Sequence, residues 1–479
     1  MRLLALTLLM TAMHAVATDC DLALIGGRVM DPETGLDAIR NVCIVSGGIT
    51  AVTTDALHGK RTEDVSGQVV APGFIDLHAH SQDPRSMRFQ AADGVTTALE
   101  LEQGVYPVAD WLVSKRGKSP IHYGASSGHL AARILATTGI AIGNPVYAQS
   151  TLASDAADSY ANAPLQGEAL DGLVANIEKG LKEGGLGIGS GITYMPGASQ
   201  EEVLALFRLA ARYQVPVFPH IRQARQLGGN LLSPLQEVLA DAAATGAPLH
   251  IVHINSSLDE SAREAMAMIR GMRERGLDVT TEMYPYTAGS TRLESALFEN
   301  YTGDYGQLQW TETGERLTKE TFGEYRKKGG WVIIHGRSEA TNTWLVAQPD
   351  TMIASDSVPY VGDFSHPRSA GTYARVLGHY VRELNALPLM LALRKMTLEP
   401  AKRLETFSPA MRRKGRLQAG MDADITVFDP DTVLDMATYT VPARTSAGIT
   451  HVIVKGTFVV DGGELRTDVF PGEAVTSSL

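Results

Sequence analysis

Eight short apolar segments recur along the middle of the chain, and amphipathic helical patterns separate most of them. Each segment has the length of a strand and is rich in large apolar residues, which is typical of parallel strands covered by helices. The eight predicted strands are residues 74–80, 95–102, 121–125, 186–192, 215–220, 249–253, 279–284 and 351–356. Eight strand–helix units predict an α/β fold, a (β/α)8 TIM-like barrel, over residues 72–405.

Two of the intervening helices have start and stop signals. Ser199 stands three residues before Glu202, the spacing of a capping box, and predicts a helix over residues 200–213. A second helix is predicted to begin at Ser233 and to stop at Gly246, because glycine commonly ends helices.

The connection between the last two strands, residues 287–350, is long and irregular in pattern. Connections of that length are usually functional, so we expect a lid-like insertion. The alternative is a mobile linker, which the need to bury Trp310, Trp331 and Trp344 disfavours.

The sequence pattern at both ends of the chain differs from that of the middle. Short β-rich runs with Gly-Gly turns precede the barrel, and similar β-rich runs return after Gly415. Two matching ends around a different middle predict one small β-sandwich domain, built from residues 18–71 and 406–479.

The first 17 residues have the pattern of a secretory signal peptide. Arg2 precedes an apolar run over residues 3–12, and an A-x-A site ends at Ala17. The run is too short to cross about 30 Å of hydrocarbon, which disfavours a membrane anchor. We expect cleavage after Ala17 and a periplasmic or secreted protein without a membrane span.

The two cysteines, Cys20 and Cys43, both follow the expected cleavage site. In an oxidising compartment they can form a disulfide between neighbouring strands, and two free thiols are an equally weighted alternative.

The net charge of −11, without a basic cluster, disfavours nucleic acid as a partner, since phosphate binding needs concentrated Lys and Arg. The expected partner is a small-molecule substrate. A homo-oligomer is compatible with the sequence.

Side chains that can bind metal stand at the carboxyl ends of the predicted strands, which in a barrel face one shared cavity. They are His78, His80, Glu100, Glu102, His220, His253 and Asp356. His78 and His80 are two residues apart and therefore project from one face of their strand. Imidazole and carboxylate together suit one or two Zn²⁺ ions, although the same ligand types also suit Mn²⁺ or Fe²⁺.

Not every histidine and glutamate is expected to touch the metal. Glu102, nearer the strand end, is the preferred bridging ligand, and Glu100 is expected to fix an imidazole from behind; the opposite assignment is the alternative. His250 points to the other face of its strand and is expected to pack there. His335 and His129 are expected to be structural. The alternative for His129 is that its side chain reaches the cavity.

Asp356 ends the last predicted strand beside these ligands. A carboxylate there can accept a proton from an attacking water and pass it to a leaving nitrogen. A metal ion lowers the pKa of water towards about 7 and polarises a carbonyl. The pattern therefore predicts a metal-dependent hydrolase with Asp356 as its catalytic residue.

Longer motifs carry a resemblance to a known family. They are residues 21–32 (DLALIGGRVMDP), 71–80 (APGFIDLHAH), 94–97 (GVTT), 189–196 (GSGITYMP), 284–286 (YPY), 366–368 (HPR) and 420–429 (GMDADITVFD). With these motifs the chain resembles the amidohydrolase superfamily over nearly its whole mature length. Within that superfamily it is most similar to the N-acyl-D-amino-acid deacylases, in particular the N-acyl-D-glutamate branch.

The resemblance implies roles for individual residues. His220 and His253, with the ligand on strand two, would hold the tighter metal ion. His78, His80 and Asp356 would form a second and often weaker site.

The resemblance also implies that Tyr194 and Tyr286 contact the substrate and that Arg368 binds its α-carboxylate. A guanidinium can bind a carboxylate through two parallel hydrogen bonds, which fixes its position and orientation. The alternative for Arg368 is a surface salt bridge.

Two positions depart from the family pattern. Many relatives have a cysteine at the end of strand two and others a carboxylated lysine on strand four, where this chain reads GLGIGS; Glu102 must therefore take that role. The residue two positions after His253, a lysine in typical deacylases, is Asn255. Asn255 is kept as a substrate-binding residue, and recognition of the substrate carboxylate is expected to be redistributed, to Arg222 or Arg292.

These observations predict a hydrolase that cleaves the amide bond of N-acyl-D-amino acids, with N-acyl-D-glutamate as a candidate substrate. A dipeptidase or a cyclic-amide hydrolase of the same superfamily is the alternative, since it shares the metal ligands and differs in the pocket. A non-catalytic barrel is disfavoured because the ligand set and Asp356 are intact.

Overall fold

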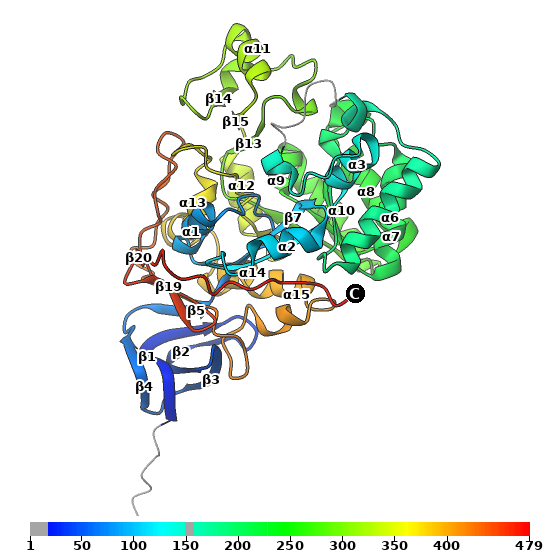
Figure 1. The fold of residues 1–479 in the computed structure, drawn as a ribbon. Coiled ribbons are helices and arrows are strands. Elements are labelled where there is room, and N and C mark those ends of the chain that lie inside the picture. The colour runs from blue at the N-terminus through cyan, green and yellow to red at the C-terminus, as the bar shows by residue number, and fades with distance from the viewer. Residues whose placement is uncertain (1–17, 149–157, 228) are drawn as a thin grey trace, which may run out of the picture.

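The computed structural model describes residues 18–148, 158–227 and 229–479, so the expected signal peptide lies outside the described residues. Eight parallel strands form a barrel at the centre of the molecule (Figure 1). In chain order they are β6 (Phe74–Asp76), β7 (Val95–Val105), β8 (His122–Gly128), β9 (Ile188–Gly191), β10 (Val217–His220), β11 (Leu249–Ile251), β12 (Val279–Met283) and β16 (Met352–Ile353). The predicted (β/α)8 fold is confirmed. Most strands are shorter than predicted, because the predicted segments included residues beyond the last ladder hydrogen bond.

The first and last strands of the barrel are joined by contacts just beyond their ends. A parallel bridge pairs Ala79 with Ser357. The buried carboxylate of Asp76 accepts hydrogen bonds from the backbone N–H groups of His78 (3.1 Å) and Ser355 (3.0 Å). Burial raises the pKa of Asp76 to about 6. These bonds fix the segment after β6, which carries the two histidines, to the segment after β16.

Helices surround the barrel (Figure 1). They include α1 (Pro84–Ala92), α2 (Val108–Lys115), α3 (His129–Thr138), α6 (Glu168–Lys182), α7 (Gln200–Tyr213), α8 (Ser233–Thr245), α10 (Ala262–Glu274), α12 (Glu339–Val346), α13 (Arg368–Arg375), α14 (Leu389–Met396) and α15 (Leu398–Leu404). The shortest are α4 (Pro145–Ala148) and α9 (Ile254–Leu258). Among the described residues, no helix has the length and apolar character that crossing a membrane requires.

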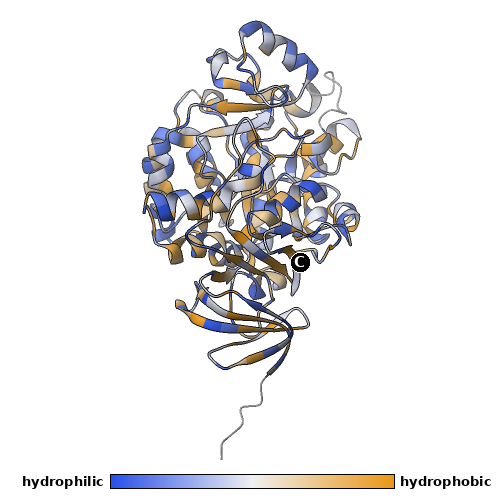
Figure 2. Cartoon of the chain, turned by 90° about the vertical axis from the view of Figure 1, so that its left-hand side faces the viewer, coloured by the Kyte–Doolittle hydropathy of each residue, from blue (hydrophilic) through white to orange (hydrophobic). Residues whose placement is uncertain are grey.

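The helix signals in the sequence act as predicted. The Ser199 hydroxyl accepts a hydrogen bond from the Glu202 N–H (3.1 Å) and begins α7, while Gly246 ends α8 in the left-handed conformation, with φ of +74°. The apolar faces of these helices pack on strands that are themselves buried. Figure 2 shows hydrophobic residues on the central strands and both kinds of residue along the helices.

The two chain ends form a separate nine-stranded sheet at the base of the barrel (Figure 1). Its strands are β1 (Thr18–Asp31), β2 (Leu36–Val45), β3 (Gly48–Thr53), β4 (Leu57–Asp64), β5 (Val69–Pro72), β17 (Ile425–Phe428), β18 (Ile449–Val454), β19 (Thr457–Asp461) and β20 (Glu464–Leu465). The antiparallel pairing of β5 with β17 joins the two ends. The last residues leave this sheet for the barrel, where the Val475 N–H donates to the Tyr123 carbonyl (2.7 Å).

The insertion between β12 and β16 is more regular than its sequence pattern indicated. Strands β13 (Ala288–Arg292), β14 (Leu308–Trp310) and β15 (Trp331–His335) form an antiparallel sheet in the order β13-β15-β14, accompanied by α11 (Lys319–Lys328). Trp310 and Trp331 are buried and Trp344 is half-buried. The insertion therefore has a small apolar core of its own, and each short strand is stabilised by its neighbours in space.

A disulfide joins Cys20 to Cys43, one of the two alternatives that the sequence left open. The cysteines lie on the neighbouring strands β1 and β2, with 5.4 Å between their Cα atoms. Both side chains are buried. The disulfide closes a loop over a sequence separation of 23 residues.

Denatured, unreduced protein is expected to contain no free thiol, and reduced protein two. Since the crosslink limits the unfolded chain over a loop of this length, reduction is expected to lower the free energy of unfolding by about 3 kcal/mol. Thiol titration and denaturant unfolding measure the two quantities. Two free thiols before reduction would contradict the disulfide.

Candidate metal centre

The six residues predicted to bind metal converge at the carboxyl-terminal end of the barrel. Their ligand atoms form three overlapping groups, each within 4.8 Å: His78 with His80 and Glu102, His78 with His253 and Asp356, and Glu102 with His220 and His253. Five of the six side chains are buried, and His220 is half-buried. Residues up to 278 positions apart in the sequence thus share one site, because parallel strands end on the same rim.

The imidazole nitrogens stand at separations suited to shared ions. The Nε2 atoms of His78 and His80 are 3.1 Å apart, and His253 Nε2 is 3.2 Å from His220 Nδ1. Two nitrogens bound tetrahedrally to one Zn²⁺ at the usual bond length would be about 3.3 Å apart. The geometry therefore fits two neighbouring positions, each approached by a pair of histidines.

The outward nitrogens of three of these rings are engaged by other side chains. His78 Nδ1 contacts Glu282 Oε1 (2.7 Å), and His80 Nδ1 contacts Glu100 Oε1 (2.9 Å). His253 Nδ1 contacts the Ser257 hydroxyl (3.1 Å). The two carboxylates favour a proton on Nδ1 of His78 and His80 and so direct the Nε2 atoms of these two rings to the centre. Glu100 thus holds an imidazole from behind, as its sequence position indicated.

Glu102 stands between the two histidine pairs. Its Oε1 is 2.8 Å from His220 Nδ1, and its Oε2 is 3.5 Å from His80 Nε2. Burial alone would raise the pKa of Glu102, but the hydrogen bond and charge of His220 lower it, so the group is a carboxylate. The buried Oε2 atom has no hydrogen-bond partner among the described residues. A buried carboxylate oxygen without a hydrogen-bond partner, close to imidazole nitrogens that face the same centre, suits a cation bound between them.

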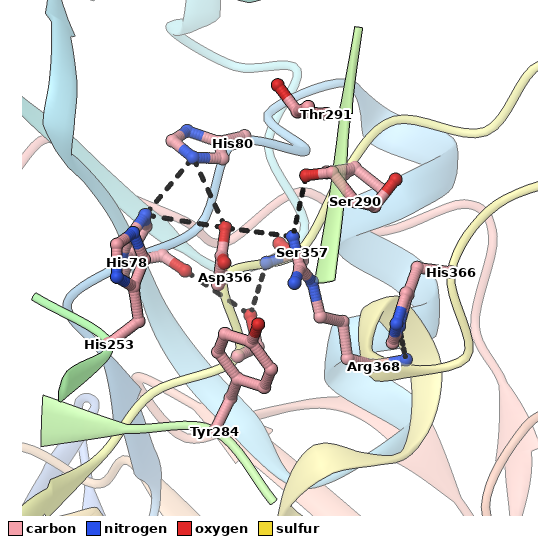
Figure 3. Close-up of polar contacts among 12 residues, drawn as sticks. His78, His80, His253, Tyr284, Ser290, Thr291, Asp356, Ser357, His366 and Arg368 are labelled. Carbon is pink, nitrogen blue, oxygen red and sulfur yellow. Dashed lines mark hydrogen bonds and ion pairs between the residues drawn. The ribbon is translucent and has the colours of Figure 1, made fainter. Parts of the chain in front are cut away.

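Asp356 faces both histidines of the first pair, and Figure 3 shows these contacts with Arg368 on its other side. Its Oδ1 lies 3.5 Å from His78 Nε2, 3.4 Å from His80 Nε2 and 3.0 Å from Arg368 Nη2. Burial alone would raise the pKa of Asp356, but Arg368 and His78 hold it well below its usual range. Asp356 is therefore ionised and able to accept a proton.

Two of the converging residues have an uncommon backbone conformation. His253 and Asp356 have φ values of +31° and +51°, in the left-handed region that residues other than glycine seldom adopt. Both follow the end of a barrel strand, where the chain turns its side chain into the cavity. Strain of this kind tends to occur at functional sites.

The same cluster sets the pKa values of its histidines in opposite directions. Burial lowers the pKa of His253 well below its ordinary value, and the neighbouring His220 adds to that shift. Burial also disfavours a charged His80, but Glu100 and Asp356 outweigh it and raise the His80 pKa well above the ordinary value. His253 is therefore neutral, the form that binds metal, whereas protons compete for His80.

Glu282 is a site residue that the sequence reasoning missed. It lies on β12 and joins two histidines, since Oε1 contacts His78 Nδ1 and Oε2 contacts His250 Nε2 (3.1 Å). The interactions with both imidazoles outweigh burial and lower the Glu282 pKa to about 2. The available signal was an acidic residue inside a predicted strand, β12 (VTTEM). His250, which was expected to point away from the cavity, does not line it and instead contacts Glu282.

A cavity of about 330 Å³ opens above the cluster. Its lining includes His80, His220, His253, Asp356, Tyr194 and Tyr284. Tyr194 was expected to face the substrate and does line the cavity, with its hydroxyl 3.1 Å from Thr291 Oγ1. Tyr286 does not: its hydroxyl donates to Asp435 (3.3 Å). Tyr284, two residues earlier in the chain, lines the cavity.

Arg368 is buried beside Asp356 and not at the surface, so the alternative of a surface salt bridge is excluded. Its guanidinium lies 4.7 Å from the centre of the Tyr284 ring and donates from Nη2 to the Ser290 carbonyl (3.4 Å; Figure 3). Its Nε and Nη1 atoms are buried without a partner among the described residues. These donors can bind an anion that enters beside Asp356.

Three other residues were expected to bind the substrate. Arg222 lines the cavity but pairs with Glu237 (2.9 Å), and Arg292 lines it and pairs with Glu294 (2.5 Å). Asn255 does not face the cavity. Its amide is buried and donates to the Tyr284 carbonyl (2.8 Å), so it supports the backbone below Tyr284.

The remaining candidate histidines are structural. His129 is buried between Ser190 Oγ (2.9 Å) and Glu202 Oε1 (2.7 Å), and does not reach the cavity. His335 contacts Gln309 (2.8 Å), and burial lowers its pKa to about 4.

Comparison with known proteins identifies the family. The model of the amidohydrolase family matches residues 61–460. The D-aminoacylase of Alcaligenes xylosoxydans xylosoxydans is 30% identical over 470 residues, which cover 91% of this chain and 93% of the relative. The N-acyl-D-glutamate deacylase of the same organism is 29% identical over 472 residues, with the same coverage.

A solved structure has the same fold. The N-acyl-D-glutamate deacylase of Bordetella bronchiseptica, complexed with zinc and a phosphonate inhibitor, matches with a TM-score of 0.80 and 24% identity. The match covers 96% of this chain and all of that one. The family model and the 30% identical relative show that the chain is a member of the amidohydrolase family and, within it, of the N-acyl-D-amino-acid deacylases.

Proposed function

We propose that this protein is a zinc-dependent hydrolase that cleaves N-acyl-D-amino acids to a carboxylate and a free D-amino acid, with N-acyl-D-glutamate as the first candidate substrate. The observation that carries the proposal is a cluster of imidazole nitrogens and carboxylates that includes the unpartnered Glu102 Oε2. Asp356 of this cluster lies beside the buried Arg368. The relatives named above act on substrates of this kind. A metal centre next to an anion site suits an amide whose amino half carries a carboxylate.

The donor set fits zinc. Four imidazoles and two carboxylates offer nitrogen and oxygen ligands, and Glu102 lies where it can bridge two ions. His220 and His253 would hold one ion, and His78, His80 and Asp356 the other. When bound, zinc lowers the pKa of water and polarises a carbonyl.

The chain's own residues supply binding and proton transfer. Arg368 would bind the α-carboxylate of the substrate and so set the scissile amide over the metal residues. Asp356, ionised in the cavity, would accept a proton from the attacking water and donate it to the leaving nitrogen. The hydroxyls of Tyr194 and Tyr284 can donate to the substrate, since both residues line the cavity.

We also propose that the protein is exported and that cleavage after Ala17 leaves Thr18 as its first residue. The signal-like pattern of the first 17 residues and the buried Cys20–Cys43 disulfide support this proposal. Expressed from its full sequence in a bacterium, the protein is expected in the periplasmic or secreted fraction. Intact mass and amino-terminal sequencing would identify the mature end; a full-length cytoplasmic product would contradict the proposal.

The zinc-loaded protein is expected to hydrolyse N-acetyl-D-glutamate and not N-acetyl-L-glutamate. Because Asp356 transfers the proton, Asp356→Asn is expected to lower kcat by about 10²- to 10⁴-fold in folded protein. Product formation, with zinc analysis and circular dichroism on the same samples, measures this. If metal-loaded protein cleaves neither enantiomer but cleaves dipeptides or cyclic amides, the deacylase proposal is wrong and the alternative hydrolase is correct.

Glu282→Gln is expected to weaken zinc binding about 10- to 100-fold, because it removes the carboxylate that orients His78. Competition with a chelator measures the affinity. The matched control is Glu202→Gln, which removes another buried carboxylate that contacts a histidine, His129, outside the cavity. Equal zinc affinity in Glu282→Gln and the unmodified protein would refute the role of Glu282.

A further inference from the structure

The arginines that line the cavity differ in whether their charge is neutralised. Arg222 and Arg292 each have a carboxylate within 3 Å. Arg337, on the insertion just after β15, forms no ion pair with any side chain that the structure describes, and its guanidinium donates from Nη1 to the Ile334 carbonyl (3.0 Å). Arg337 is therefore a positive charge on the cavity wall without a counter-charge among the described residues.

The position of Arg337 depends on a glycine. Gly289 on β13 pairs with Ile334 on β15, and the guanidinium of Arg337 lies against this pair. A Cβ atom at Gly289 would come within 2.8 Å of both Nη1 and Nη2 of Arg337. The absence of a side chain at Gly289 thus gives the guanidinium its place on the cavity wall.

This place is close to the proposed reaction site along the same strand. Ser290, the residue after Gly289, accepts a hydrogen bond from Arg368 at its carbonyl oxygen (3.4 Å). Apolar side chains of the insertion, Leu297, Trp331 and Ile334, line the cavity as well. A substrate held at Arg368 would meet an apolar wall and, on that wall, the guanidinium of Arg337.

We propose that Arg337 binds a second carboxylate of the substrate and so makes the enzyme selective for N-acyl-D-amino acids with two acidic groups. This inference rests on the deacylase function proposed above and adds a residue that sets its specificity. The second carboxylate would belong either to the amino-acid side chain or to a dicarboxylic acyl group. A methylene arm suits the apolar wall, and a guanidinium without a counter-charge suits the carboxylate at its end.

The test compares charged and neutral substrates of similar shape. N-acetyl-D-glutamate against N-acetyl-D-glutamine tests the side chain, and N-succinyl-D-alanine against N-butyryl-D-alanine tests the acyl group. Arg337→Gln is expected to lower kcat/KM for the charged member of one pair by about 10- to 100-fold and to leave its neutral partner unchanged. The pair that responds identifies the source of the carboxylate.

Three further variants separate charge from general damage. Arg337→Lys keeps the charge and is expected to retain part of the preference. Gly289→Ala is expected to lose the preference by displacing the guanidinium, which can move because it is the end of a flexible side chain. Arg316→Gln, an exposed arginine of the same insertion that bonds only to carbonyls, is the matched control and is expected to change nothing.

Binding distinguishes failure of this inference from failure of the proposed function. Titration calorimetry of zinc-loaded protein with the dicarboxylates D-glutamate and N-succinyl-D-alanine, and with D-glutamine as the neutral ligand, needs no catalysis. A preference for a dicarboxylate that disappears in Arg337→Gln supports the inference even if no amide is cleaved. Hydrolysis of neutral substrates with equal effects of Arg337→Gln on both members of each pair would overturn the inference and leave the deacylase function intact.

Discussion

The structure of the site depends on one buried carboxylate, Glu102, which stands among imidazoles from three other segments of the chain. A carboxylate oxygen without a partner in the interior is costly. A cation held by this oxygen and the neighbouring imidazole nitrogens would offset that cost. The arrangement is therefore stable as a metal site and poorly explained as an ordinary packed core.

The imidazole rings of this cluster are held in position by carboxylates on several strands of the barrel. Glu282 and Glu100 hold the outer nitrogens of His78 and His80, while Asp76 binds the backbone on both sides of the barrel seam. Each of these carboxylates is buried and paired, so replacing one leaves a partner unsatisfied. The rigid strand ends thereby set the positions of the ligand atoms before any metal arrives.

The insertion adds what the barrel lacks. Its sheet covers one side of the cavity with apolar residues and brings Arg337 to the wall, while the segment after the barrel strand β16 brings Arg368 beside Asp356. The barrel thus holds the metal-binding residues, Asp356 among them. The sheet of the insertion shapes the part of the cavity that would contact the variable parts of a substrate.

The sequence by itself determined the eight strands, the two β-rich ends and the six converging residues, because strand periodicity and the rule that parallel strands end on one rim are local or general properties. Tertiary structure decided the rest. Tyr284 and not Tyr286 faces the cavity, Asn255 turns away from it, and Arg222 and Arg292 are neutralised by Glu237 and Glu294. The contacts of Glu282 with two histidines, the order within the insertion and the lack of an ion pair for Arg337 among the described residues are likewise visible only in three dimensions. Which way a side chain points, and whether its charge meets a partner, depends on residues far away in the sequence, and no local pattern records their distance.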